Sequence, residues 1–216
     1  MSGGAPSVAA THVEPVDRDL LVADPLEVAP RLLGLVVAHG GRAGRVVEVE
    51  AYRGTEDPAS HAFRGRTPRN ATMFGRAGLL YVYFSYGTHW CANVVCGEEG
   101  VAGAVLLRAL EPVGGVEAMR APRAARRRDG RHPPDADLCR GPGNLTRALG
   151  IGPEHDGVDL LGPGADGPRL VAGRAWPVAP AEVARGPRVG ISRATEADWR
   201  FWVAASPSVS GRRRHR

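Results

Sequence analysis

Lysine is absent from the sequence, so all 28 residues counted as lysine or arginine are arginines. No side chain can therefore form a Schiff base, and a covalent mechanism that depends on a lysine amine is excluded. The abundance of Ala, Gly, Pro and Arg is typical of a GC-rich genome, which explains the absence without reference to function. The exclusion holds whatever its cause.

Cysteine is scarce, and the usual metal and nucleophile motifs are missing. The three cysteines, Cys91, Cys96 and Cys139, form an odd set without a C-x-x-C pair, which argues against a disulfide framework and a four-ligand zinc site. The seven histidines show neither H-x-x-x-H nor H-E-x-x-H spacing. No phosphate loop and no G-x-S-x-G motif is present. We therefore expect no metal and no cofactor.

Long apolar runs are also absent. Nothing approaches the roughly 18 residues that a membrane span needs, and residues 1–10 carry no secretory signal. We expect a cytoplasmic protein that does not bind membranes and that associates with the nucleoid if it is bacterial. Its 216 residues, 43% hydrophobic and 24% charged, suit one folded domain with a net charge of +5.

Turn residues divide the chain into short elements, since glycine and proline occupy 29 and 18 positions. Asp24-Pro25 and Gly34 predict a helix over 25–33, with a kink at Pro30. Two hairpins are predicted, one from 35–38 with 45–52 and one from 79–85 with 90–96. Further strands are predicted at 104–110, 169–171 (an edge strand), 188–192 and 200–204. Further helices are predicted at 67–74, 114–119 and 144–149, and a basic loop at 120–134. The pattern predicts an α+β fold: a flexible leader at 1–14, a single mixed domain at 15–206 and a basic tail at 207–216.

Three charged residues lie inside apolar strands, namely Glu48, Glu50 and Arg108. Glu48 and Glu50 share one face of the strand at 45–52, while the opposite face packs. The spacing alone favours a solvent-facing Glu50 on an edge strand. However, Arg108 in the strand at 104–110 needs a partner, and the carboxylate of Glu50 could supply it. Such a buried pair would be structural or catalytic.

Aromatic residues make up 6% of the chain, and most lie within forty positions. They are Tyr52, Phe63, Phe74, Tyr81, Tyr83, Phe84, Tyr86 and Trp90, beside His61, His89 and several arginines. One interpretation is an aromatic hairpin that belongs to the core. The other is a surface that stacks on bases next to phosphate contacts. The residues alone leave both open.

Long ordered motifs resemble a known family. They are VVEVEAY at 46–52, DPASH at 57–61, TPRN at 67–70, GLLYVYFSYG at 78–87, LLRALEP at 106–112, LCRGPGNLTRAL at 138–149, RVGI at 188–191 and WRFW at 199–202. Together they closely resemble the methylpurine (3-methyladenine, or alkyladenine) DNA glycosylases, over residues 17–206. The resemblance implies a curved antiparallel sheet with short surrounding helices and a protruding hairpin that inserts into DNA.

The resemblance also implies residue roles. Glu50 would be the general base and Arg108 its positioning partner; Tyr52, Tyr83 and His61 would enclose the flipped base; Asn93 would crowd the exocyclic amine of guanine; Tyr86 would be the wedge, with Met73 beside it in the groove; and Arg66, Arg69 and Arg147 would contact the DNA backbone. The arginine-rich segment 120–131 and the tail at 212–216 depart from the family's common core, and their roles are left open.

The implied activity is base-excision repair of double-stranded DNA that contains damaged purines, by a monomer. A monofunctional glycosylase would flip out 3-methyladenine or 7-methylguanine, hydrolyse the N-glycosidic bond and leave an abasic site; hypoxanthine is an open question. The missing lysine agrees with a monofunctional enzyme. Two alternatives remain: a non-enzymatic protein that binds alkylation damage on the same scaffold, and an RNA-processing module recognised only by charge and aromatics.

Overall fold

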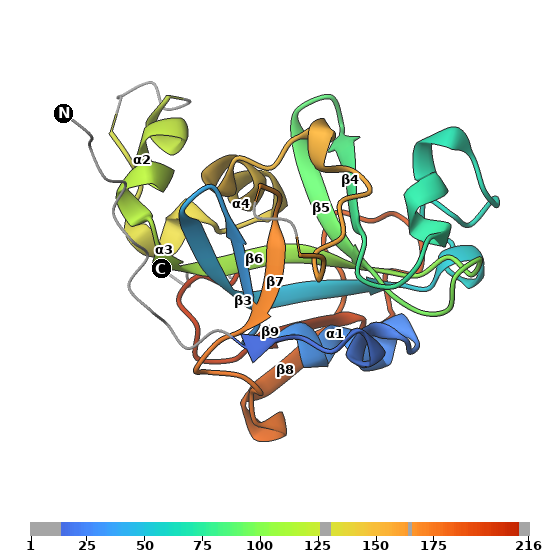
Figure 1. The fold of residues 1–216 in the computed structure, drawn as a ribbon. Coiled ribbons are helices and arrows are strands. Elements are labelled where there is room, and N and C mark those ends of the chain that lie inside the picture. Colours follow the sequence, from blue (N-terminus) through green and yellow to red (C-terminus); the bar gives the residue numbers. More distant parts are fainter. Residues whose placement is uncertain (1–13, 126–130, 164–165, 212–216) are drawn as a thin grey trace.

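The computed structural model describes residues 14–125, 131–163 and 166–211, in which strands of one antiparallel sheet alternate with short helices (Figure 1). The strands are β1 (Glu14–Pro15), β2 (Val36–His39), β3 (Arg42–Tyr52), β4 (Leu80–Ser85), β5 (His89–Val95), β6 (Ala104–Gly114), β7 (Arg169–Ala172), β8 (Val183–Gly186) and β9 (Arg200–Val203). The helices are α1 (Pro25–Leu32), α2 (Val116–Ala124), α3 (Asp135–Leu138) and α4 (Pro142–Leu149), with 3-10 turns η1 (Arg18–Leu21), η2 (Gly54–Glu56), η3 (Pro68–Phe74), η4 (Pro153–His155) and η5 (Pro180–Glu182).

The sheet is open, and β3 is at its centre. Its strand order is β1-β7-β2-β3-β6-β5-β4, while β9 pairs with the second half of β3 and carries β8. The pairing of β3 with β6 shifts register on both sides of Glu48, so Val47 and Arg108 fall outside the regular pairs. Such bulges redirect side chains and are common beside active sites. The predicted α+β fold is confirmed.

Helices cover both faces of this sheet: α2, α3 and α4 lie on one face, and α1 lies on the other (Figure 1). The cap predicted for α1 is confirmed, because the Asp24 side chain accepts a hydrogen bond from the Leu26 amide at 2.8 Å. Val28 and Leu32 of α1 are fully buried in the main core. None of the helices in the described ranges is long and apolar enough to cross a membrane.

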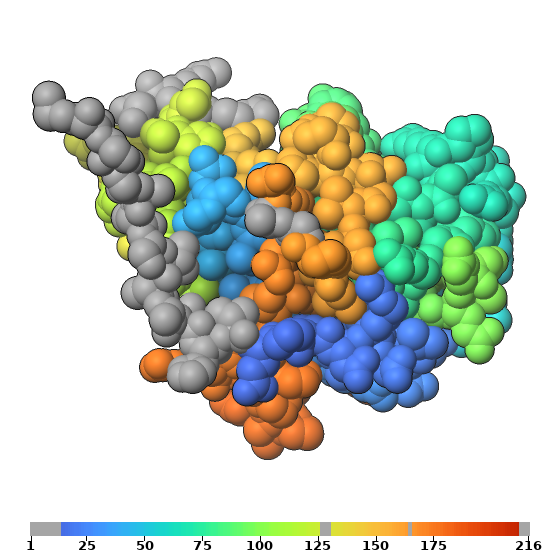
Figure 2. Space-filling model, in the orientation of Figure 1, coloured from blue at the N-terminus to red at the C-terminus, as the bar shows by residue number. Residues whose placement is uncertain are grey.

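A second layer of loops closes one end of the sheet, where residues 54–78 pack against the segment around 155–162 (Figure 2). Thr72 donates to Asp156 at 3.0 Å, and Arg76 pairs with Asp159 at 2.6 Å. The helix predicted at 67–74 is the 3-10 turn η3, which starts where the Thr67 amide donates to the Asn70 side chain at 2.7 Å. This layer supports the loop that carries His61.

Two strand predictions are wrong. The strand β7, predicted at an edge, lies between β1 and β2, because Glu14, which was assigned to the flexible leader, pairs with it. No strand forms at 188–192, since Arg188 turns inward and Gly190 has a φ of 79°. Two observed strands were not predicted: β1, and β8 just before this segment.

The basic loop predicted at 120–134 is wrong in its first part. The helix α2 runs on to Ala124 through Pro122, because Met119 is fully buried and Arg120 pairs with both Glu117 and Asp135. Residues 126–130 of that segment, and residues 212–216 of the basic tail, lie outside the described residues.

Candidate active site

The β4–β5 hairpin projects from the sheet and ends in a strained turn (Figure 1). Tyr86 and Gly87 have φ angles of 47° and 66°, and the Thr88 amide donates to the Ser85 carbonyl at 2.9 Å. A tyrosine with positive φ costs conformational energy, which points to a functional constraint. The side chain of Tyr86 is 84% exposed, yet its hydroxyl donates to the Gly190 carbonyl at 2.9 Å.

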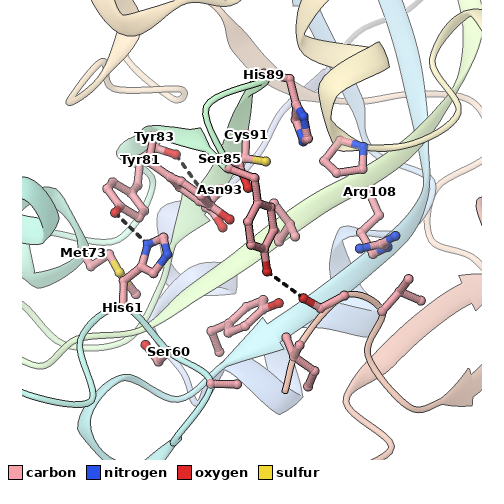
Figure 3. A pocket seen from close by; sticks show the side chains of 18 of the residues that line it. Ser60, His61, Met73, Tyr81, Tyr83, Ser85, His89, Cys91, Asn93 and Arg108 are labelled. Atoms are coloured by element: carbon pink, nitrogen blue, oxygen red, sulfur yellow. Dashed lines mark hydrogen bonds between the residues drawn. The ribbon is translucent and has the colours of Figure 1, made fainter. Parts of the chain in front are cut away.

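A cavity of about 540 Å³ lies beneath this hairpin (Figure 3). Its walls come from β3, β4, β5 and β6, from the loop at 59–61 and from residues 189–191. The residues that line it include Tyr52, His61, Met73, Tyr81, Tyr83, Tyr86, Cys91, Asn93, Arg108 and Val189. Segments far apart in sequence thus meet around one space large enough for a purine.

One wall of the cavity is aromatic (Figure 3). The rings of Tyr81 and Tyr83 stack with centroids 5.5 Å apart, and His61 meets Tyr83 edge-on at 4.3 Å. The His61 Nδ1 lies 3.1 Å from the Tyr81 hydroxyl. Partial burial, with a smaller effect of Arg69, lowers the pKa of His61 below its usual value. Burial raises the pKa of Tyr81 to about 12.

Two further predicted residues lie at the base of this wall. Asn93 is 4% exposed and donates to the Tyr81 carbonyl at 3.0 Å, so its side chain is fixed at the cavity floor. Met73 is 2% exposed and packs with Tyr81 in a small cluster. Its position is therefore in the cavity wall, and a contact with a DNA groove remains a prediction that this burial does not support.

Glu50 lies directly behind the cavity floor and is fully buried. Its Oε1 accepts from the Val189 amide at 2.7 Å and lies 3.2 Å from Arg108 Nη1, while its Oε2 accepts from the Tyr52 hydroxyl at 3.0 Å. Burial raises the pKa of Glu50, an effect that Arg108, Val189 and Tyr52 oppose. The solvent-facing edge position is thus wrong, because β3 is paired on both sides.

Arg108 is buried and uses all three guanidinium nitrogens. Nε donates to Glu48 at 3.1 Å, Nη2 donates to Ser210 at 3.1 Å and Nη1 faces Glu50. The predicted pairing of Arg108 with Glu50 is confirmed. The sequence reasoning did not single out Glu48, although its position two residues before Glu50 on the same strand face was a signal for it.

A second buried ion pair supports Tyr52 from outside the cavity. Arg188 binds Asp57 through two nitrogens, at 2.5 and 2.9 Å, with both side chains fully buried. Its guanidinium lies 4.7 Å from the Tyr52 ring centre and 4.8 Å from that of Trp199. Because Val189 follows Arg188, the pair also fixes the amide that contacts Glu50.

The predicted backbone-contacting arginines lie apart from the buried pairs. Both Arg66 and Arg69 are exposed: Arg66 lies over the Phe74 ring, 6.0 Å from its centre, and Arg69 donates to the Phe84 carbonyl of the hairpin at 3.2 Å. Arg147 lies on α4 and lines a second, shallower hollow with Thr88 of the hairpin turn. Within the described part of the chain, no three His, Cys, Asp or Glu side chains are placed to hold a metal ion.

Comparisons with known proteins identify the family of the chain. The family described as "Methylpurine-DNA glycosylase (MPG)" matches residues 19–207. A protein of Burkholderia lata is 54% identical over 186 residues, covering 86% of each chain, and one of Frankia casuarinae is 52% identical over 196 residues, covering 87% of this chain and 88% of its own. A third, from Nocardia farcinica, is 50% identical and covers 90% of each chain. All three carry the name "Putative 3-methyladenine DNA glycosylase".

Proposed function

Because this chain belongs to the methylpurine-DNA glycosylase family and is a DNA glycosylase of DNA repair, we propose that it excises 3-methyladenine and 7-methylguanine from duplex DNA. The observation that supports this proposal is a cavity large enough for a purine, with an aromatic wall and a buried carboxylate behind its floor. Alkylation at N3 or N7 makes the purine cationic, so the faces of Tyr52 and Tyr83 attract it.

The reaction requires that the target nucleotide leave the helix, because the N-glycosidic bond is hidden in the duplex. Tyr86 is proposed to fill the gap that the flipped nucleotide leaves. Its bond to the Gly190 carbonyl spans the cavity mouth, so insertion of the ring into DNA would break that bond. Arg66, Arg69 and Arg147 would bind phosphates and supply affinity that does not depend on sequence.

Hydrolysis needs one activated water and no covalent intermediate. Glu50 is proposed to take the proton of that water and to stabilise the positive charge that develops on the sugar. Tyr52, Arg108 and Val189 line the cavity and also contact Glu50, so only these groups separate the carboxylate from the space that the water would occupy. Asn93 would crowd the exocyclic amine of an undamaged guanine.

The direct test is a single-turnover incubation with alkylated duplex DNA beside a duplex that carries one hypoxanthine, scoring released base and alkali-labile abasic sites. Release from alkylated DNA supports the proposal, and release from both extends it to a neutral leaving group. Tight lesion binding without release from either would favour the damage-binding protein instead. Preference for RNA over duplex DNA would favour the RNA-processing module.

Loss of the Tyr86 ring should slow release from duplex DNA. We expect Tyr86→Ala to reduce the single-turnover rate about 10- to 100-fold, since an inserted aromatic ring contributes about 1–3 kcal/mol of stacking. Tyr86→Phe keeps the ring and loses only the bond to Gly190, so its rate should equal or exceed that of the wild type. Release from alkylated single-stranded DNA is the control. An equal loss on single strands would contradict the wedge role.

The pH profile of the reaction should report the ionisation of Glu50. A base must be deprotonated to act, and burial raises the pKa of Glu50 above 4.5. The rate should therefore rise with pH through an acid limb above 4.5 and be lost as pH falls through it. The variant His61→Gln should keep this limb, which separates the ionisation of Glu50 from that of a histidine in the cavity wall. A rate independent of pH would argue against Glu50 as the base.

A further inference from the structure

Glu48 forms a second buried carboxylate behind Glu50, and the proposed chemistry does not use it. Its side chain is fully buried, two residues before Glu50 on β3. Its Oε1 accepts from Arg108 Nε at 3.1 Å, Arg200 Nη1 at 3.2 Å and Ser210 Oγ at 3.0 Å. Its Oε2 accepts from the Ser210 amide at 2.5 Å. Such complete pairing offsets the cost of burying a carboxylate.

The geometry of Arg108 depends on this carboxylate. A guanidinium is a rigid planar fork, so a bond at Nε fixes the direction of both Nη groups. With Nε on Glu48 and Nη2 on Ser210, only Nη1 is left for Glu50. Without Glu48, Arg108 could turn and bind both oxygens of Glu50, which is the preferred geometry of an arginine–carboxylate pair.

The register shift between β3 and β6 explains how Arg108 reaches both glutamates. Glu48 pairs with Ala109 and Val49 pairs with Leu107, so Arg108 is the residue that the ladder leaves out. A bulge at this position directs the Arg108 side chain toward the two glutamates. Arg200 comes from β9, which pairs with β3 at Glu48 and Glu50, so a second strand delivers the second cation.

We propose that Glu48 is a positioning residue for the reaction: it holds Arg108 to a single contact with Glu50, so that Glu50 Oε2 accepts from Tyr52 alone and keeps its other lone pair for the proton of the attacking water. This inference rests on the proposed role of Glu50 as the base. Glu48 itself touches neither the cavity nor the substrate. Its effect passes through Arg108.

Loss of the Glu48 carboxylate should change the pH dependence of the reaction rate. The charged and titratable groups that act on Glu50 are Glu48 and Tyr52 of β3, Arg108 of β6, Tyr83 of β4 and Cys91 of β5. Replacement of Glu48 by Gln removes one neighbouring negative charge and turns the charge-assisted bond to Arg108 Nε into a weaker neutral one, so Arg108 is less restrained from binding Glu50 more fully. Both changes favour the ionised form of Glu50, so the acid limb should move to lower pH while Glu50 becomes a weaker base.

The test is Glu48→Gln in the full chain, with single-turnover release of 3-methyladenine measured as a function of pH. We expect the plateau rate to fall about 10-fold or more and the acid limb to shift toward lower pH. Glu27→Gln is the matched control, because Glu27 forms an exposed pair with Arg31 at 3.2 Å and should change neither quantity. Circular dichroism and thermal unfolding would establish that both variants fold.

Each outcome separates the two claims. A folded Glu48→Gln protein with the wild-type rate and pH profile overturns the positioning role. A lower rate with an unmoved acid limb overturns it as well, because Glu48 would then have a purely structural role. If Glu48→Gln does not fold, Ser210→Ala provides a second test, because it removes one contact to Glu48 and one to Arg108. It should shift the acid limb in the same direction by a smaller amount. The absence of any shift would overturn the proposal. Wild-type activity in Glu50→Gln would instead refute the proposed base.

Discussion

We expect Glu50→Gln to lower the single-turnover release of 3-methyladenine by about 100- to 10,000-fold, which is the usual contribution of a general base. The amide keeps the size of the side chain and an oxygen that can accept from the Val189 amide, but it cannot take a proton from water. Lesion binding should persist, because the cavity walls remain. Fluorescence anisotropy with a lesion-containing duplex would measure this binding beside the rate.

The same variant distinguishes the enzyme from a damage-binding protein. If Glu50→Gln released the base at the wild-type rate, Glu50 would not be the base, and the buried pair with Arg108 would be structural. Glu27→Gln again provides the exposed control for loss of one carboxylate charge. A binding defect as large as the rate defect would mean that the substitution disturbs the cavity rather than the chemistry.

The second large effect concerns stability, and Asp57→Asn should lower the free energy of unfolding by about 3 kcal/mol or more. The change leaves Arg188 fully buried with an uncompensated charge, which is the costly way to break such a pair. Urea denaturation followed by tryptophan fluorescence would measure it, since Trp199 stacks on Arg188. The loss should also weaken catalysis, because Arg188 packs against Tyr52.

An exposed ion pair supplies the control for this result. Asp135→Asn removes one of the two carboxylate partners of Arg120, a surface contact of 2.8 Å, and should change stability by about 1 kcal/mol at most. The double variant Asp57→Asn with Arg188→Met removes both buried charges and should recover part of the lost stability. Equal effects of Asp57→Asn and Asp135→Asn would show that the buried pair contributes no more than a surface one.

Local signals predicted the parts of the fold that local chemistry determines. Asp24-Pro25 starts α1, and the glycines after His39 and Tyr86 close the two hairpins. The failures at β7, β8 and α2 share another cause: pairing or packing with distant residues decided them. Neither the contact of Glu14 with Ala172 nor the burial of Met119 can be read from nearby residue types.

The candidate site divides in the same way. The pairing of Glu50 with Arg108 could be predicted, since a lone arginine in an apolar strand requires an acid. The contact of Arg108 with Glu48 could not be predicted. It depends on a register shift and on Ser210, which lies 162 positions after Glu48 in the chain. The pairing of Asp57 with Arg188, across 131 positions, was hidden for the same reason.

The late position of Arg200 and Ser210 bears on the order of events during synthesis. The hairpin and its aromatic wall come from residues 52–93, which leave the ribosome early, whereas Glu48 obtains its last partners across 152 and 162 positions. Contacts of such long range form late in folding. We therefore expect a nascent chain to contain the hairpin and its aromatic wall before Glu48 has its last partners, so a partly made protein would lack the arrangement proposed for the base.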